Sequence, residues 1–146
     1  MTVVEDEVPL RELIATTLER SGRFLVDAPD VDGWREAVIQ TQPQVLLLDL
    51  FLEGQDALEG LPQVLVASPH TMVAVLTAMA AEDQESRSLA AGAFVFYEKA
   101  SIAQLPDMIA ADHASFQRAL AGEDVMAPSA LVRRPPPSED FSVAAG

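Results

Sequence analysis

The sequence predicts one α/β domain, built as a doubly wound parallel sheet with helices on both faces. Two observations carry this prediction. Within the segment Pro43–Leu50, residues Val45–Leu48 are apolar without interruption up to Asp49, which is typical of a strand buried on both sides of a parallel sheet. Short apolar runs also alternate along the chain with segments of helical periodicity, a pattern that favours parallel strands joined by crossover helices. At 146 residues the chain is about one domain long and can bury a hydrophobic core without support from disulfides or bound metals.

Five strands and five helices are expected in alternation. The strands are expected at Val3–Val4, Phe24–Val26, Pro43–Leu50, Met72–Leu76 and Phe94–Tyr97. The helices are expected at residues 9–18, from a cap at Asp30 or Asp32 to Gln42, and at 61–67, 82–91 and 102–120. The first strand is unusually short, and the third helix is shortened by Gly60 and Pro62. Pro106 is compatible with the last helix in its first turn and bends it elsewhere.

The amino-acid composition argues against several classes of function. Nine Lys and Arg against 23 Asp and Glu give a net charge of −14, which argues against direct nucleic-acid binding and is compatible with a cation partner. The absence of Cys excludes disulfides and thiolate metal sites, and the absence of a signal-peptide pattern predicts a cytoplasmic protein. The uncharged stretch from Leu61 to Ala81 contains prolines and a turn signal, so two buried elements are expected and no membrane span.

The chain is expected to divide at residue 120. Residues 1–120 carry the alternating pattern, whereas residues 121–146 contain Arg133-Arg134 and three consecutive prolines, typical of an extended or disordered tail or linker. About 26 residues are too few for a DNA-binding or catalytic output domain.

Polar side chains stand where the predicted strands end. They are Glu5, Asp6, Asp49, Thr77 and Lys99. Because the carboxyl ends of parallel strands share one edge, we expect these side chains to meet there. Three acids can hold a hard divalent cation, and the cation, a hydroxyl and an ammonium together neutralise a transferring phosphoryl group. One carboxylate would be the nucleophile.

These residues resemble the receiver domain of the response-regulator family over Val3 to about Leu120. The matching motifs are VVEDE, LLLDL, LTA and FYEK. The resemblance implies the flavodoxin-like strand order 2-1-3-4-5 and a Mg²⁺-dependent signalling protein. It would take a phosphoryl group from a histidine kinase or histidine phosphotransfer protein and hydrolyse it slowly. The implied downstream partner is another protein, and the resemblance leaves homodimerisation open.

The resemblance also assigns roles residue by residue. Asp49 would accept the phosphoryl group. The Mg²⁺ ligands would be Asp6 directly, Glu5 through water, Asp49, and the backbone carbonyl of Phe51. The phosphoryl oxygens would be contacted by Thr77 and Lys99, and the switch residues would be Thr77 and Phe96. Phe51 and Met79, two residues beyond Asp49 and Thr77, would flank the approach of the hydrolytic water, and both are apolar.

Two departures concern the loops of the site. Glu53 stands where the family often has proline, and Ala100 stands where proline usually follows the lysine. A cis bond costs about 3–4 kcal/mol before a residue other than proline, so we expect a trans bond at Lys99–Ala100 and a rearranged loop.

Three alternatives stay open. The chain could be the receiver of a longer regulator whose output domain is absent, or a receiver-like interaction module that is never phosphorylated. A phosphatase of the haloacid-dehalogenase type would carry a second acid two residues after the nucleophile, where this chain has Phe51.

Overall fold

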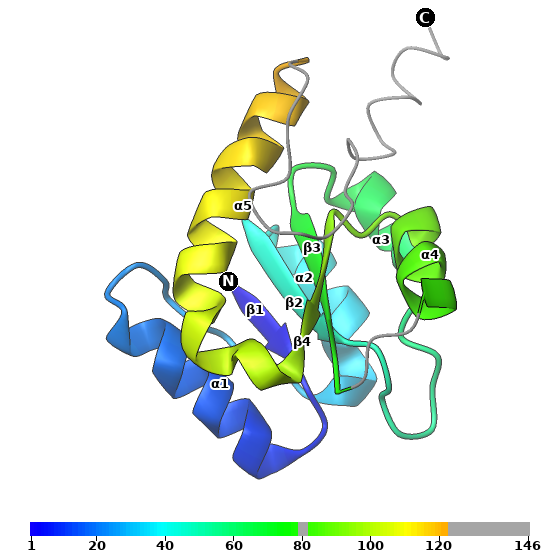
Figure 1. Cartoon of the computed structure of the whole chain (residues 1–146). Helices are drawn as coiled ribbons and strands as arrows, with labels where there is room; N and C mark the ends of the chain where they lie inside the picture. The colour runs from blue at the N-terminus through cyan, green and yellow to red at the C-terminus, as the bar shows by residue number, and fades with distance from the viewer. Residues whose placement is uncertain (79–81, 123–146) are drawn as a thin grey trace, which may run out of the picture.

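The sheet is the centre of the structure, a computed structural model that describes residues 1–78 and 82–122. Four parallel strands lie in the order β1-β2-β3-β4 (Figure 1). Their bounds are β1 Thr2–Val4, β2 Val45–Asp49, β3 Met72–Thr77 and β4 Val95–Glu98. The predicted fold class is therefore confirmed.

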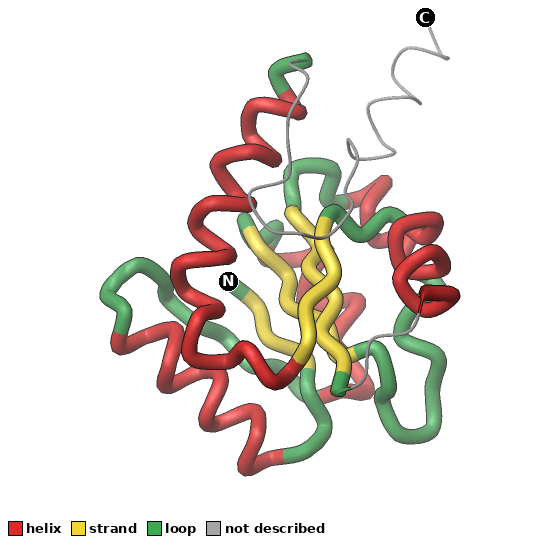
Figure 2. Tube along the Cα trace, viewed as in Figure 1, coloured by secondary structure: helices red, strands yellow, loops and turns green. Residues whose placement is uncertain are grey.

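Helices cover both faces of the sheet (Figures 1 and 2). On one face lie α1 (Val8–Arg20) and α5 (Leu105–Leu120), the latter preceded by the 3₁₀ helix η2 (Lys99–Gln104). On the other lie α2 (Trp34–Thr41), preceded by the 3₁₀ helix η1 (Val31–Gly33), then α3 (Leu61–Ala67) and α4 (Glu82–Ala91). No helix in the described ranges has both the length and the apolar character to span a lipid bilayer.

Side-chain alternation along the strands divides the core into two clusters. Leu46 and Leu48 of β2 belong to the cluster with Trp34 of α2, whereas Leu47 belongs to the cluster with Ile14 of α1. All five residues of β2 are buried, as the uninterrupted apolar run predicts. This central strand holds Asp49 rigidly at its carboxyl end.

The strand expected at Phe24–Val26 does not form as a regular strand. One isolated parallel bridge joins Asp27 to Thr2, so the described sheet has four strands instead of five. Only Asp27 bonds to β1 through backbone–backbone contacts here, donating to Met1 O and accepting from the N–H of Val3. The segment nevertheless lies beside β1, the position that the order 2-1-3-4-5 assigns to it.

The predicted helices form, but α2 and α5 start differently from the prediction: residues 102–104, expected in the last α-helix, belong to η2. The expected Asp cap is wrong, because η1 precedes α2, the N-cap position is Gly33, and neither helix start has a side-chain cap. Pro106 lies in the first turn of α5, where it needs no bend. Ala121 and Gly122 form a turn after α5, and the rest of the predicted tail lies outside the described residues.

Candidate functional site

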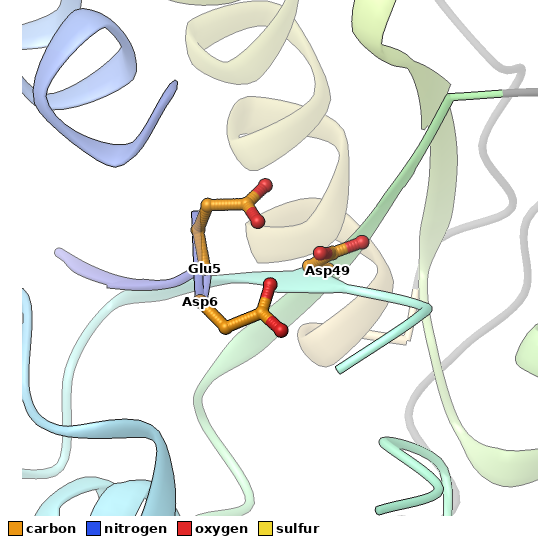
Figure 3. A group of neighbouring side chains, drawn as sticks. All are labelled: Glu5, Asp6 and Asp49. Carbon is orange, nitrogen blue, oxygen red and sulfur yellow. The ribbon is translucent and has the colours of Figure 1, made fainter. Parts of the chain in front are cut away.

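Three carboxylates meet at the carboxyl edge of the sheet. Glu5 and Asp6 follow β1, and Asp49 ends β2; the pairing of Val4 with Leu48 brings these strand ends together. One oxygen of each carboxylate lies within 4.8 Å of the others, and Figure 3 shows the three groups around one region. Glu5 and Asp49 are buried, and Asp6 is half-buried. The predicted acidic cluster therefore forms.

Lys99 reaches this cluster from the end of β4. Its Nζ lies 2.9 Å from Glu5 Oε1 and 3.4 Å from Asp49 Oδ2. The described residues contain no cis peptide bond, and Lys99 opens η2 directly after the strand. The trans backbone at Ala100 therefore leaves the ammonium within reach of both acids.

Thr77 is placed by the register of the strands. Asp49 pairs with Leu76, the residue before Thr77, and Thr77 pairs with Glu98, the residue before Lys99. Thr77 is fully buried at the end of β3. The hydroxyl-bearing residue therefore occupies the strand between the predicted nucleophile and the lysine.

The surroundings raise the pKa values of Asp49 and Lys99. Burial, followed by the hydrogen bond and the negative charge of Glu5, raises the pKa of Asp49 to about 7, although the Phe51 N–H and Lys99 act in the opposite direction. Burial alone would lower the pKa of Lys99, but its contacts with Glu5 and Asp49 outweigh burial and raise it. The lysine remains protonated while Asp49 titrates near neutral pH without a metal.

Asp6 experiences the opposite electrostatic effect. The N–H of Glu53 donates a 2.8 Å hydrogen bond to Asp6 Oδ2, and this bond is the main cause that lowers the pKa of Asp6. Proline has no N–H, so the departure from the family's proline at position 53 supplies this donor. The substitution therefore helps keep Asp6 ionised.

A pocket of about 440 Å³ opens beside the acids. It is lined by Asp6, Leu50, Phe51, Leu52, Glu53, Gln55, Asp56 and Arg87. Arg87 of α4 forms a 3.3 Å ion pair with Asp56 in the loop after β2. Neither residue is predictable from the sequence, because a helix and a loop separated by 31 positions carry no spacing signal. Phe51 is 57% exposed here, and its N–H donates to Asp49 Oδ1 at 3.2 Å.

One predicted switch residue, Phe96, is not brought into the cluster. Phe96 is fully buried in the core cluster that contains Leu48 and Trp34. Met79 lies outside the described residues, so its predicted place beside the phosphoryl group stays a prediction.

The donor set suits a hard divalent cation. Two oxygens on opposite sides of Mg²⁺ are roughly 4 Å apart, twice a Mg–O distance of about 2.1 Å. One carboxylate oxygen each from Glu5, Asp6 and Asp49 lies within 4.8 Å of the others, which leaves room for one such ion among them. Three acids facing one ammonium also leave an excess of negative charge, which such a cation would neutralise.

The fold and this site match one family. Residues 1–110 match the response regulator receiver domain family. The chain belongs to this family and is a receiver domain of the two-component type.

Several relatives show the extent of the similarity. The phosphate regulon transcriptional regulatory protein PhoB of Pseudomonas aeruginosa is 32% identical over 94 residues, which cover 62% of this chain and 41% of PhoB. The response regulator protein PilR of the same species is 30% identical over 109 residues, 74% of this chain and 24% of PilR. The chain thus matches less than half of the length of these curated relatives.

Solved receiver domains share the fold. The receiver domain of NtrX from Brucella abortus superposes with a TM-score of 0.67 at 26% identity, covering 84% of this chain and 98% of that one. A CheY-like receiver domain protein from Methanospirillum hungatei gives a TM-score of 0.69 at 21% identity, covering 81% and 95%.

Proposed function

We propose that the chain is a phosphoacceptor that receives a phosphoryl group on Asp49 from a histidine kinase or a histidine phosphotransfer protein. The observation that carries the proposal is the convergence of a buried carboxylate, a lysine ammonium and two further acids at one sheet edge beside an open pocket. Family membership supports the same reaction class.

In the proposed reaction an Asp49 oxygen attacks the phosphorus in line with the leaving group. The bond from phosphorus to the imidazole nitrogen breaks, and the imidazole leaves with the electron pair. Lys99, within 3.4 Å of Asp49, balances negative charge on the phosphoryl oxygens, and Thr77 donates its hydroxyl to one of them. The attacking carboxylate must be ionised, so any group that lowers its raised pKa favours the reaction.

Glu5, Asp6, Asp49 and the Phe51 carbonyl would hold Mg²⁺ in this proposal. When bound, the ion would supply positive charge that keeps Asp49 ionised and neutralises the phosphoryl oxygens. Asp6 is prepared for this role because the Glu53 N–H lowers its pKa.

The readout is proposed to be contact with another protein. The charge of −14 disfavours direct nucleic-acid binding by this chain. Transcriptional regulation is the named activity of PhoB, and this chain matches 41% of that protein. A receiver within a longer regulator and a free-standing receiver would both transmit the state of Asp49 through surface contacts.

The deciding experiment treats the purified protein with acetyl phosphate and MgCl₂ and measures its intact mass. We expect one phosphoryl adduct, which requires Mg²⁺ and is absent in Asp49→Asn. Asp32→Asn is the matched control, since Asp32 is an exposed acid in η1 outside the cluster. An adduct that survives Asp49→Asn contradicts the assignment of Asp49. No adduct in the parent protein supports the receiver-like module that is never phosphorylated.

A further inference from the structure

The segment Arg23–Asp27, here called the edge segment, forms the outer margin of the sheet beside β1. The N–H of Asp27 donates to Met1 O, and the N–H of Val3 donates to Asp27 O, both at 2.8 Å. In an extended chain successive backbone groups point to opposite sides. The N–H and C=O of Phe24 and Val26 therefore point away from β1, and no backbone hydrogen bond among the described residues uses them.

The side chains of the edge segment also alternate. Phe24 and Val26 are half-buried and pack against the α1 and α5 core cluster. Arg23, Leu25 and Asp27 are exposed, and Leu25 is 88% exposed, more than any other large apolar side chain described. Natural sheet edges are normally blocked by a proline, a bulge or an inward charge. The edge segment has no proline, and an apolar residue stands at its centre.

We propose that the edge segment pairs with its own copy in a second molecule, antiparallel about Leu25, to form a symmetric homodimer. In this register Phe24 faces Val26 of the partner, so the outward backbone groups of both segments form mutual hydrogen bonds. Leu25 packs against Leu25, and the two sheets become one.

The charges of the edge segment favour a second copy of the protein as its binding partner. Its sequence, Arg-Phe-Leu-Val-Asp, has opposite charges at its two ends. Antiparallel self-pairing places Arg23 opposite Asp27 twice, on the same exposed face as Leu25. A parallel arrangement would place like charges together. Since each molecule contributes the same surface, the contact closes at two copies.

The charge and the size of the contact both predict a weak dimer. Each molecule carries a charge of −14, and Arg23 already contacts Asp107 of α5 at 2.7 Å. A contact over five residues is also small, which is typical of transient association. The dimer is therefore weak and strengthens with salt, because salt screens the repulsion between the two bodies.

Cross-linking tests the register directly, because the chain contains no cysteine. Leu25 faces Leu25 as a non-hydrogen-bonded pair, with Cα atoms about 4.5 Å apart, which a disulfide can span. We expect Leu25→Cys to form a disulfide dimer on mild oxidation at least about tenfold faster than Val66→Cys. Val66 of α3 is a suitable control, since it is 62% exposed and distant in sequence from the edge. Equal rates for the two variants overturn the proposal.

Sedimentation of the cysteine-free protein tests the dimer without a covalent bond. The parent should dimerise with rising concentration, more in 0.5 M than in 0.1 M NaCl. Leu25→Asp should weaken the dimer at least about tenfold, as should Val26→Pro, which removes an outward N–H. Val66→Asp should match the parent. A parent that stays monomeric throughout, or a dimer that survives both edge variants, overturns the proposal. Phosphoryl labelling of Asp49 should be unchanged in all variants, which separates this test from that of the proposed function.

Discussion

The surroundings of Asp49 favour its protonated form, which opposes its proposed role as a nucleophile unless positive charge lies nearby. Its buried position beside Glu5 raises its pKa to about 7, whereas a nucleophile must be ionised. The positive charge of Lys99 opposes this rise in the pKa of Asp49, and a divalent cation bound to the acidic cluster would oppose it further. The same burial that disfavours the carboxylate excludes water and strengthens these charge contacts.

This raised pKa predicts how stability changes with pH when metal is removed by EDTA. The folded state binds the Asp49 proton more tightly than the unfolded state, whose pKa is near 3.8. Its contribution to the free energy of unfolding is therefore lost as pH rises from about 4 to about 7. Asp49→Asn removes this loss and should stabilise the protein by about 2–3 kcal/mol more at pH 8 than at pH 5. Urea denaturation measures the difference.

The control for this prediction is Asp32→Asn, which removes an exposed acid from η1. Its effect on stability should be nearly the same at both pH values. A pH-independent effect of Asp49→Asn would show that the carboxylate is already ionised at pH 5.

Phe51 concerns the lifetime of the proposed phosphoryl group. Its apolar ring is exposed beside Asp6 and cannot orient a water for hydrolysis. Phe51→Asn should speed loss of the adduct on the order of tenfold, because a positioned polar group assists proton transfer from water. Phe51→Leu, which stays apolar, should keep the parent lifetime. Intact mass against time after removal of acetyl phosphate gives the rate.

A second variant tests the other residue assigned to the water's approach. Phe51→Asn combined with Met79→Glu should lose the phosphoryl group at least as fast as Phe51→Asn alone. If the double variant is no faster than the parent, the lifetime is set elsewhere.

At the scale of elements, a buried hydrogen bond joins β4 to α5. Tyr97 Oη donates to Asp112 Oδ2 at 2.5 Å, and both side chains are buried. Phe94, the residue before β4, also contacts Phe116 of α5 edge-to-face, with ring centroids 5.1 Å apart. These contacts hold α5 against the strand that leads to Lys99.

Tyr97→Phe should lower the free energy of unfolding by about 1–2 kcal/mol, because it removes the hydroxyl while Asp112 stays buried. Asp112→Asn keeps an acceptor oxygen and should cost less. Thermal or urea denaturation measures both variants. A smaller loss for Tyr97→Phe than for Asp112→Asn would contradict the importance of this hydrogen bond.

At the scale of the whole molecule, the described core and the site occupy the same part of the chain. Both core clusters and the residues Glu5, Asp6, Asp49, Thr77 and Lys99 lie within residues 1–122. The N–H of Gly122 donates to Ala119 O at 3.0 Å and closes the last turn of α5.

Truncation after Gly122 should therefore keep the melting temperature within a few degrees and leave Asp49 labelling unchanged. The measurements are a thermal melt and the acetyl phosphate assay on both chains. A truncated protein that folds but is not labelled would show that the tail takes part in the reaction.

The sequence alone determined the fold class, the buried central strand and the polar residues that end the strands. The apolar run of β2 and the alternation with helical periodicity are local signals, because a buried strand must be apolar on both faces. The positions of Asp49, Thr77 and Lys99 at strand ends follow from the same signals. Their meeting follows from the shared edge of parallel strands.

Only the tertiary structure decided the features that depend on contacts between residues distant in sequence. Phe24–Val26 has a strand's composition, yet the one bridge to β1 is made by the next residue, Asp27. The Glu53 N–H on Asp6 and the pairing of Arg87 with Asp56 depend on how a loop folds over the sheet edge. The pKa of Asp49 depends on burial and on its distance from Glu5. Composition and spacing cannot report these quantities, because the energy of each polar contact depends on distances and solvent exposure that only packing establishes.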